Sequence, residues 1–250
     1  MNVLYIVGTG SKHDNLELRW SLRSLAKFGR GVGRVIVAGV PPAWLSGDVE
    51  RVDVLSSTGI GGRNRAITMN VLEGVRKSGL RGEFVLGIDD VFLLEPVDLD
   101  AMPTYAAGYH LPRVNPTGGT WGAAMVECGE WLRRHGYRDV NFMTHMHIRM
   151  NADVIMRHFD EIERTALTNE TVRGLDILSL VGNMTLADLA AGYVDEFRPR
   201  FRHDFKIEKL DLTGVGDSFS ISDRAFDDPK FVEFMNAHFG QPCRYERSDK

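Results

Sequence analysis

The chain has few cysteines: only Cys128 and Cys243 occur in 250 residues, and they lie far apart without metal-ligand spacing. A disulfide framework is therefore not expected, and a reducing cytoplasm is the expected location. Long apolar runs are missing too, since none approaches the roughly 18 to 20 residues of a membrane span. The first residues show no basic leader followed by a cleavage site. We therefore expect a soluble, cytoplasmic protein.

A large excess of charge of one sign is also missing. The 34 acidic and 30 basic residues give a net charge of -4 and are mixed along the chain. This balance excludes a whole-protein field of the kind that duplex-coating proteins carry. One local basic run, residues 198–206, interleaves Arg, His and Phe, which suits phosphate contacts and base stacking. An exposed basic strand is an equally good interpretation of that run.

Strand-like and helix-like segments alternate through the first hundred residues, which is the pattern of a sheet with crossover helices. Apolar runs predict strands, and helical spacing of apolar residues predicts helices. The pattern loosens after residue 94, so we expect an α/β core followed by a more irregular α+β half. The predicted strands are 3–8, 32–40, 49–57, 84–88, 106–114, 205–212 and 218–223, and the predicted helices are 16–28, 64–78, 121–135, 151–164 and 229–239. Asp14 or Asn15 is the expected N-cap of the first helix, and Asn151 is the expected N-cap of the helix 151–164.

Two adjacent carboxylates, Asp89 and Asp90, interrupt the apolar segment FVLGIDDVFLLEP. Buried ionised neighbours repel each other and need a compensating positive charge. In open α/β sheets, ligands collect outside the carboxyl ends of the strands, where this pair is predicted to lie. Such a pair suits Mg²⁺ or Mn²⁺ shared with substrate phosphates. The alternative is a pair that caps a turn through hydrogen bonds to the backbone.

Two glycine-containing loops follow other predicted strands. The segment GIGGRNR brings Gly61, Arg63, Asn64 and Arg65 to the start of a helix, where backbone N–H groups and guanidinium groups suit a phosphate. It matches neither the P-loop nor the dinucleotide fingerprint. The opening GTG, which contains Gly8 and Thr9, is a weak signal on its own. Together with the carboxylate pair, the two loops are expected to surround one nucleotide diphosphate.

An arginine pair, Arg19 and Arg23, is spaced four residues apart and therefore lies on one face of a predicted helix. If that face points inward the pair needs an anion, whereas on the surface it is simply solvated. Two histidines, His145 and His147, are predicted to share one face of a strand. Aromatic Tyr109 and Trp121 either shape an acceptor pocket or pack in the core.

Four separated segments, NLELRWSLRSLAKFG, RVIVAGVPPAWL, GGRNRAITMNVLEGV and FVLGIDDVFLLEP, cover roughly residues 3–96. They contain an Asn-x-Glu-Leu-Arg helix with a second Arg, a Pro-x-Trp-Leu turn, an Asn-containing helix start and an Asp-Asp strand end. In this order they resemble the core of the Stealth-type capsular polysaccharide transferases and their phage-encoded relatives. The sequence departs from that pattern in its GTGSKHD opening and in GIDD, which leaves open whether a sugar or a sugar phosphate is transferred.

The resemblance implies a GT-A-like fold over residues 1–250, with a nucleotide-sugar-binding half, 1–112, and an acceptor-side half, 113–250. It implies a nucleotide-sugar donor, expected to be a UDP-sugar, and Mg²⁺ or Mn²⁺ on the carboxylate pair. The site residues that it implies are Arg19, Arg23, Asn64, Asp89 and Asp90, with His145 or His147 in the later segment.

The acceptor and the general base stay open in the sequence. The acceptor is expected to be either a glycan or a hydroxymethylated pyrimidine in bacteriophage DNA, which the enzyme would have to flip out of the duplex. Candidate bases by side-chain type are Glu127, His147 and Asp204, and His203 with Asp204 is an alternative metal or diphosphate contact. A nucleotidyltransferase and a non-catalytic nucleotide-sugar-binding protein are the alternative functions.

Overall fold

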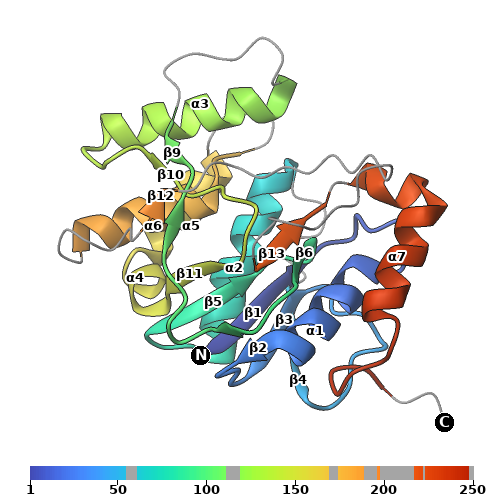
Figure 1. The fold of residues 1–250 in the computed structure, drawn as a ribbon. Helices are drawn as coiled ribbons and strands as arrows, with labels where there is room; N and C mark the ends of the chain where they lie inside the picture. Colours follow the sequence, from blue (N-terminus) through green and yellow to red (C-terminus); the bar gives the residue numbers. More distant parts are fainter. Residues whose placement is uncertain are drawn as a thin grey trace.

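A computed structural model of the chain describes residues 1–54, 61–110, 119–168, 174–188, 196–197, 217–221 and 223–247. Its centre is a five-stranded mixed sheet with the strand order β11-β5-β1-β3-β4 (Figure 1). Four strands are parallel, and β11 runs antiparallel to β5. The expectation of a mixed α/β sheet flanked by helices is therefore confirmed. The strands are β1 (Asn2–Val7), β3 (Val35–Gly39), β4 (Val49–Asp53), β5 (Glu83–Gly87) and β11 (Ile148–Asn151).

Helices cover both faces of the sheet, with α2 on one face and α1 on the other. Figure 1 shows α7 beside α1, while α3 to α6 gather beyond β11. The helices are α1 (Leu16–Phe28), α2 (Arg63–Ser78), α3 (Gly119–Arg134), α4 (Ala152–Arg157), α5 (Phe159–Thr168), α6 (Ile177–Asp188) and α7 (Pro229–Phe239), with a 3-10 helix at Asp223–Asp227. None of these helices in the described part of the chain is long and apolar enough to cross a membrane.

Within the described residues, short strands form further two-stranded ladders: β6 with β13, β9 with β10, β8 with β12, and β2 with β7. The β6–β13 pair is antiparallel and brings Phe219 opposite Phe92, so a late segment of the chain lies beside the strand that follows the carboxylate pair. The strands are β2 (Gly29–Arg30), β6 (Val91–Leu93), β7 (Val97–Asp98), β8 (Tyr105–Ala106), β9 (Gly108–Tyr109), β10 (Val140–Asn141), β12 (Glu196–Phe197) and β13 (Ser218–Ser220).

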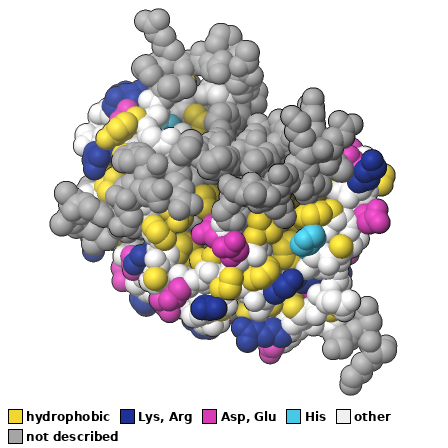
Figure 2. All heavy atoms as spheres, viewed as in Figure 1, with side chains coloured by type: hydrophobic (Ala, Val, Ile, Leu, Met, Phe, Trp, Pro, Cys, Tyr) yellow, Lys and Arg dark blue, Asp and Glu magenta, His cyan; other side chains and the backbone are white. Residues whose placement is uncertain are grey.

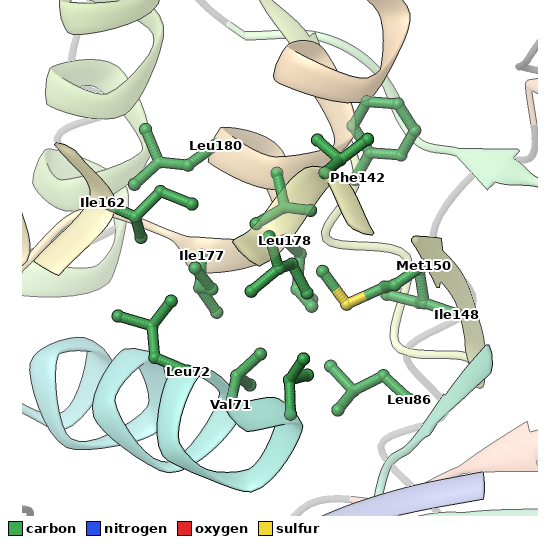
Figure 3. Close-up of a cluster of buried hydrophobic side chains, with 14 of the residues drawn as sticks. Val71, Leu72, Leu86, Phe142, Ile148, Met150, Ile162, Ile177, Leu178 and Leu180 are labelled. Atoms are coloured by element: carbon green, nitrogen blue, oxygen red, sulfur yellow. The ribbon is translucent and has the colours of Figure 1, made fainter. Parts of the chain in front are cut away.

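The core explains why the central strands are apolar throughout. Neighbouring residues of β1 point to opposite faces: Leu4 joins the cluster under α2, and Tyr5 joins the cluster under α1. Because both faces of β1, β3 and β5 are covered, these strands need apolar residues at nearly every position, whereas the edge strands β4 and β11 include charged or polar residues. Figure 3 shows part of the larger cluster, in which Leu72 of α2 and Leu86 of β5 face Ile177 and Leu178 of α6.

Three local predictions are wrong. The helix predicted over 151–164 is split into α4 and α5 at His158, although Asn151 caps it as expected through the N–H groups of Asp153 and Val154. The N-cap residue of α1, Asn15, lies in the left-handed region at φ 54° and makes no side-chain capping bond. His145 and His147 do not share a strand face, because β11 begins at Ile148 and His145 has a φ of 52°.

Candidate functional site

The candidate site lies at the carboxyl ends of β1 and β5, where the order of the sheet reverses. The chain proceeds from β1 outward to β3 and β4, and then returns to β5 on the other side of β1. Such switch points leave a crevice where ligands bind in open α/β sheets. Gly8 and Thr9 follow β1, and Asp89 and Asp90 follow β5 after Ile88. The predicted position of the carboxylate pair is therefore confirmed.

The carboxylate turn is held by side chains from α1. The hydroxyl of Ser21 donates to the carbonyl oxygen of Val91 at 2.7 Å and lies 3.2 Å from that of Ile88. The Tyr5 hydroxyl lies 3.2 Å from the same Ser21 oxygen. One turn later, Ser24 accepts a hydrogen bond from the N–H of Leu93 at 3.1 Å. Buried hydroxyls in α1 therefore fix the backbone on the carboxyl side of the pair.

Two further contacts complete the support of the turn. The N–H of Ile88 donates to Nδ1 of His147 at 3.2 Å, and the N–H of Ile221 donates to the carbonyl oxygen of Asp90 at 3.1 Å. Segments from three regions of the chain thus converge on the residues from Ile88 to Leu93. A turn fixed in this way holds its side chains in one arrangement, as a ligand site requires.

Asp89 occupies an environment that is unfavourable for its charge. Burial and the nearby carboxylate of Glu17 raise the pKa of Asp89 to about 6, and Arg63 opposes this shift. The Oε2 atom of Glu17 is itself buried without a hydrogen-bond partner in the described part of the structure. A divalent cation would relieve this excess of negative charge. Mg²⁺ commonly uses one or two carboxylates together with substrate phosphates, so the residues present fit the predicted ion.

The described residues contain no group of three or more His, Cys, Asp or Glu side chains that could enclose a metal ion by themselves. Asp89 and Asp90 would therefore need oxygen ligands from a bound substrate or from water. This is the arrangement that the sequence predicts for a metal shared with a diphosphate.

The residues at the start of α2 have different surroundings. Asn64 is buried and donates to the carbonyl oxygen of Gly174 at 2.9 Å. Arg65 donates to the carbonyl oxygens of Ala166 and Gly61. Arg63 is exposed, and its charge acts on Asp89. Of the residues predicted here, Arg63 is thus the one available to a phosphate, whereas Asn64 and Arg65 hold the protein backbone.

The arginine pair does face one anion, but that anion belongs to the protein. Arg23 donates to both carboxylate oxygens of Glu246 at 2.7 Å, and Arg19 donates to Oε2 of the same residue at 3.2 Å. Arg23 also donates to the carbonyl oxygens of Phe239 and Gly240 at the end of α7. Burial raises the pKa of Glu246, yet the bonds from Arg23, from the Cys243 N–H and from Arg19 outweigh it, and the net pKa is lowered.

A pocket of about 540 Å³ lies at the carboxyl ends of β1 and β3, and Asp89 and Asp90 are not among its lining residues. They follow β5, which is the neighbour of β1 on its other side. The pocket lining includes Gly8, Thr9, Arg19, Pro42 and Trp44. The Arg19 guanidinium lies 4.2 Å from the centre of the Trp44 ring. The pocket therefore offers an aromatic surface, a cation and exposed backbone, which are the groups that recognise a nucleotide.

His147 has one ring nitrogen committed to the protein. It is only 4 % exposed, and burial lowers its pKa to about 4, so the ring is neutral at pH 7. Because Nδ1 accepts the Ile88 N–H, the proton lies on Nε2, and Nε2 has no hydrogen-bond partner in the described part of the structure. A nitrogen that carries a proton is not a base. The arrangement favours a positioning role for His147.

The other predicted site residues lie elsewhere. Glu127 is on α3 and lines a second pocket. Tyr109 is 57 % exposed on β9. The Trp121 side chain, His203, Asp204 and the basic run 198–206 lie outside the described residues, so the predictions made for them are untested. The sequence analysis did not identify Glu17 and Ser21 as site residues. They are four residues apart, so they lie on the same face of α1, and this spacing was the available signal. Glu246 was also missed, since no local pattern identifies it.

Among known proteins, no family model and no curated protein matches this chain.

Proposed function

We propose that this protein is a metal-dependent glycosyltransferase with a GT-A-like fold. In this proposal it transfers a sugar or a sugar phosphate from a nucleotide-sugar donor, expected to be a UDP-sugar, to an acceptor hydroxyl. The main support is the carboxylate pair Asp89–Asp90, fixed at the switch point of the sheet. A pocket whose cation and aromatic ring suit a nucleotide lies at the ends of the neighbouring strands β1 and β3. The strand order of the sheet is compatible with this fold.

The parts of the site have separate roles in this mechanism. Asp89 and Asp90 would hold Mg²⁺ or Mn²⁺, which when bound supplies positive charge to the leaving diphosphate. Arg63 adds a fixed positive charge on the same side, since its field already reaches Asp89. Arg19 and Trp44 would bind the nucleotide in the 540 Å³ pocket. Ser21 and His147 keep the carboxylate turn in place.

A panel of nucleotide sugars incubated with the purified protein tests the proposal, with donor consumption measured with and without EDTA. We expect consumption of one donor, loss of consumption with EDTA and recovery with excess Mn²⁺. Asp89→Asn and Asp90→Asn should each lower the rate by orders of magnitude. Asp160→Asn is the matched control because Asp160 is an exposed aspartate on α5. Unchanged turnover in EDTA would contradict the metal dependence.

The alternative functions give different results in the same experiment. A nucleotidyltransferase would consume a nucleoside triphosphate and release pyrophosphate. A non-catalytic binding protein would retain a nucleotide sugar without consuming it, and Asp89→Asn would leave its affinity nearly unchanged.

A further inference from the structure

A second pocket, of about 450 Å³, lies between α3 and α5, separate from the residues of the candidate site. Figure 1 shows α3 extended above the α5 and α6 region. The lining includes Glu127, Trp131 and His135 from the α3 side and Glu161, Arg164 and Thr168 from α5. On α3 these positions are four residues apart, and on α5 they are three and four apart, so each helix presents one face to the pocket.

The facing side chains are polar where packed helices usually present aliphatic residues. On α5, the opposite face carries Ile162 and Ala166 into the core. Among the lining residues, all of which belong to the described part, no hydrogen bond or ion pair crosses from α3 to α5. Glu127 pairs with Arg134 of its own helix at 3.6 Å, and Glu161 pairs with His158 at 3.3 Å. The pocket therefore has donors and acceptors that the protein does not use across it.

One wall of the pocket is aromatic. The His135 and Trp131 rings stack with their centres 3.9 Å apart and an angle of 19° between their planes. His135 Nδ1 lies 2.8 Å from the Trp131 carbonyl oxygen, to which it must donate. In the neutral ring, Nε2 is therefore left as an acceptor. Trp131 itself is 8 % exposed, so the exposed imidazole forms most of the ring surface that a ligand would meet.

The chemistry of the lining selects among ligand classes. Two carboxylates with a single arginine disfavour a polyanion such as a nucleic acid backbone. Carboxylates and an imidazole nitrogen accept hydrogen bonds from hydroxyl groups, and Arg164 donates to them, next to a ring that can pack on a sugar face. The Thr168 hydroxyl already donates to the Arg164 carbonyl oxygen at 2.8 Å, so it offers a ligand only acceptor lone pairs. The volume lies within the range of small-molecule sites.

We propose that this pocket binds a neutral saccharide. Binding there does not require glycosyl transfer by the protein. The use of this pocket as a subsite for the acceptor rests on the proposed function. It would favour a glycan over modified DNA as the acceptor.

An array of neutral, acidic and amino-containing glycans, probed with the labelled full-length protein, tests this proposal. We expect retention on at least one neutral glycan, and a loss of affinity of roughly tenfold or more in His135→Ala and in Glu161→Gln. Two matched controls should bind as the wild type does. His238→Ala removes a histidine with the same contact to a carbonyl oxygen four residues earlier, at 2.9 Å, and Glu163→Gln removes a neighbouring carboxylate on α5 outside the pocket lining.

Each outcome on the array is decisive. The proposal is overturned if the wild-type protein binds none of the neutral glycans. It is also overturned if both pocket variants bind a neutral glycan as well as the wild type does. Retention only on phosphorylated or sulfated glycans would also overturn it. Donor consumption by the wild-type protein, measured separately, reports on the proposed transferase function, so the two ideas can fail independently.

Discussion

The backbone N–H of Ile88 donates to Nδ1 of His147 at 3.2 Å, which ties the residue before the carboxylate pair to the segment that leads into β11. This bond requires a neutral imidazole with a free Nδ1 lone pair. The folded pKa of His147 is about 4, well below the usual 6.5, because the ring is buried. Protonation of His147 therefore opposes the folded state.

The contribution of His147 to stability should consequently fall on acidification from about pH 6.5 to about pH 4. Asp89, whose pKa is raised to about 6, contributes in the opposite direction. A group whose pKa is depressed on folding contributes its full stability above the unfolded pKa and loses it as the pH falls toward the folded pKa. For His147 the loss is at most about 3 kcal/mol. His110, whose pKa is also lowered to about 4 by burial, contributes in the same direction. Urea denaturation at several pH values measures the sum.

The variant His147→Gln separates the two histidines. Its amide oxygen can accept the Ile88 N–H, so the turn is preserved, but the side chain does not titrate. The free energy of unfolding should then fall less steeply between pH 6.5 and 4 than in the wild type. An unchanged slope would show that His147 is solvated and protonates freely in the folded protein.

The carboxylate at Asp89 is expected to destabilise the protein when no cation is bound. The pKa of Asp89 in the folded protein is about 6, above the usual 3.8, so protonation of Asp89 stabilises the folded protein at low pH. This stabilisation is lost as the pH rises through 6. At pH 7.5 in EDTA, Asp89→Asn should raise the free energy of unfolding by about 1 to 2 kcal/mol. Thermal denaturation measures this. Asp160→Asn should change little, and destabilisation by Asp89→Asn would contradict the prediction.

Manganese should stabilise the wild-type protein, in which Asp89 can bind the ion, but not the variant Asp89→Asn. Mn²⁺ that binds the folded wild-type protein raises the melting temperature in a concentration-dependent manner. Asp89→Asn should lose this response, whereas Asp160→Asn should keep it. An equal response in all three proteins would place the ion elsewhere.

Loss of the Ser21 hydroxyl is expected to lower both the stability of the protein and its affinity for Mn²⁺. Ser21→Ala removes the donor to the Val91 carbonyl and the partner of the Tyr5 hydroxyl, both in buried surroundings. We expect a loss of about 1 to 3 kcal/mol and a weaker affinity for Mn²⁺, measured by isothermal titration. Ser78→Ala is the control, since its hydroxyl bonds only to carbonyls of its own helix. A stability loss with normal Mn²⁺ affinity would limit Ser21 to a structural role.

Glu246 should carry an unusually large stabilising effect for an ion-pair residue. Its side chain is 3 % exposed and serves both Arg19 and Arg23. Removing its charge in Glu246→Gln leaves the Arg23 guanidinium without its anion, while Arg19 keeps the exposed Asp14 carboxylate at 3.6 Å, and we expect a cost of about 3 kcal/mol. The exposed pair of Glu50 with Arg34 is the control, because Glu50→Gln at 38 % exposure should cost at most about 1 kcal/mol. Equal effects of the two variants in urea denaturation would contradict this difference.

Local sequence patterns predicted the elements around the site well. Helices α1, α2 and α7 begin and end within one residue of their predicted limits, because apolar spacing, glycine and proline mark these ends in the chain itself. The break at His158 was not predicted, since the apolar residues of α4 and α5 continue with nearly the same spacing across it. The left-handed conformation of Asn15 was not predicted either, because residue type alone does not fix a backbone angle.

The roles of charged residues were predicted less well than their positions. Helical spacing placed Arg19 and Arg23 on one face, but it could not identify Glu246, which lies 223 residues after Arg23. Similarly, Asn64 and Arg65 occupy the predicted helix start, yet their hydrogen bonds go to Gly174 and Ala166, more than a hundred residues away.

The amino-acid sequence by itself determined the alternation of strands and helices, the apolar character of the buried strands and the position of Asp89 and Asp90 at the end of β5. These features depend on interactions between residues that are close in the chain. Only the tertiary structure decided which charges meet: Glu17 and Arg63 beside Asp89, Glu246 between two arginines, and His147 against Ile88. The physical reason is that pKa values and hydrogen-bond partners are set by burial and by neighbours in space, which the order of the residues does not specify.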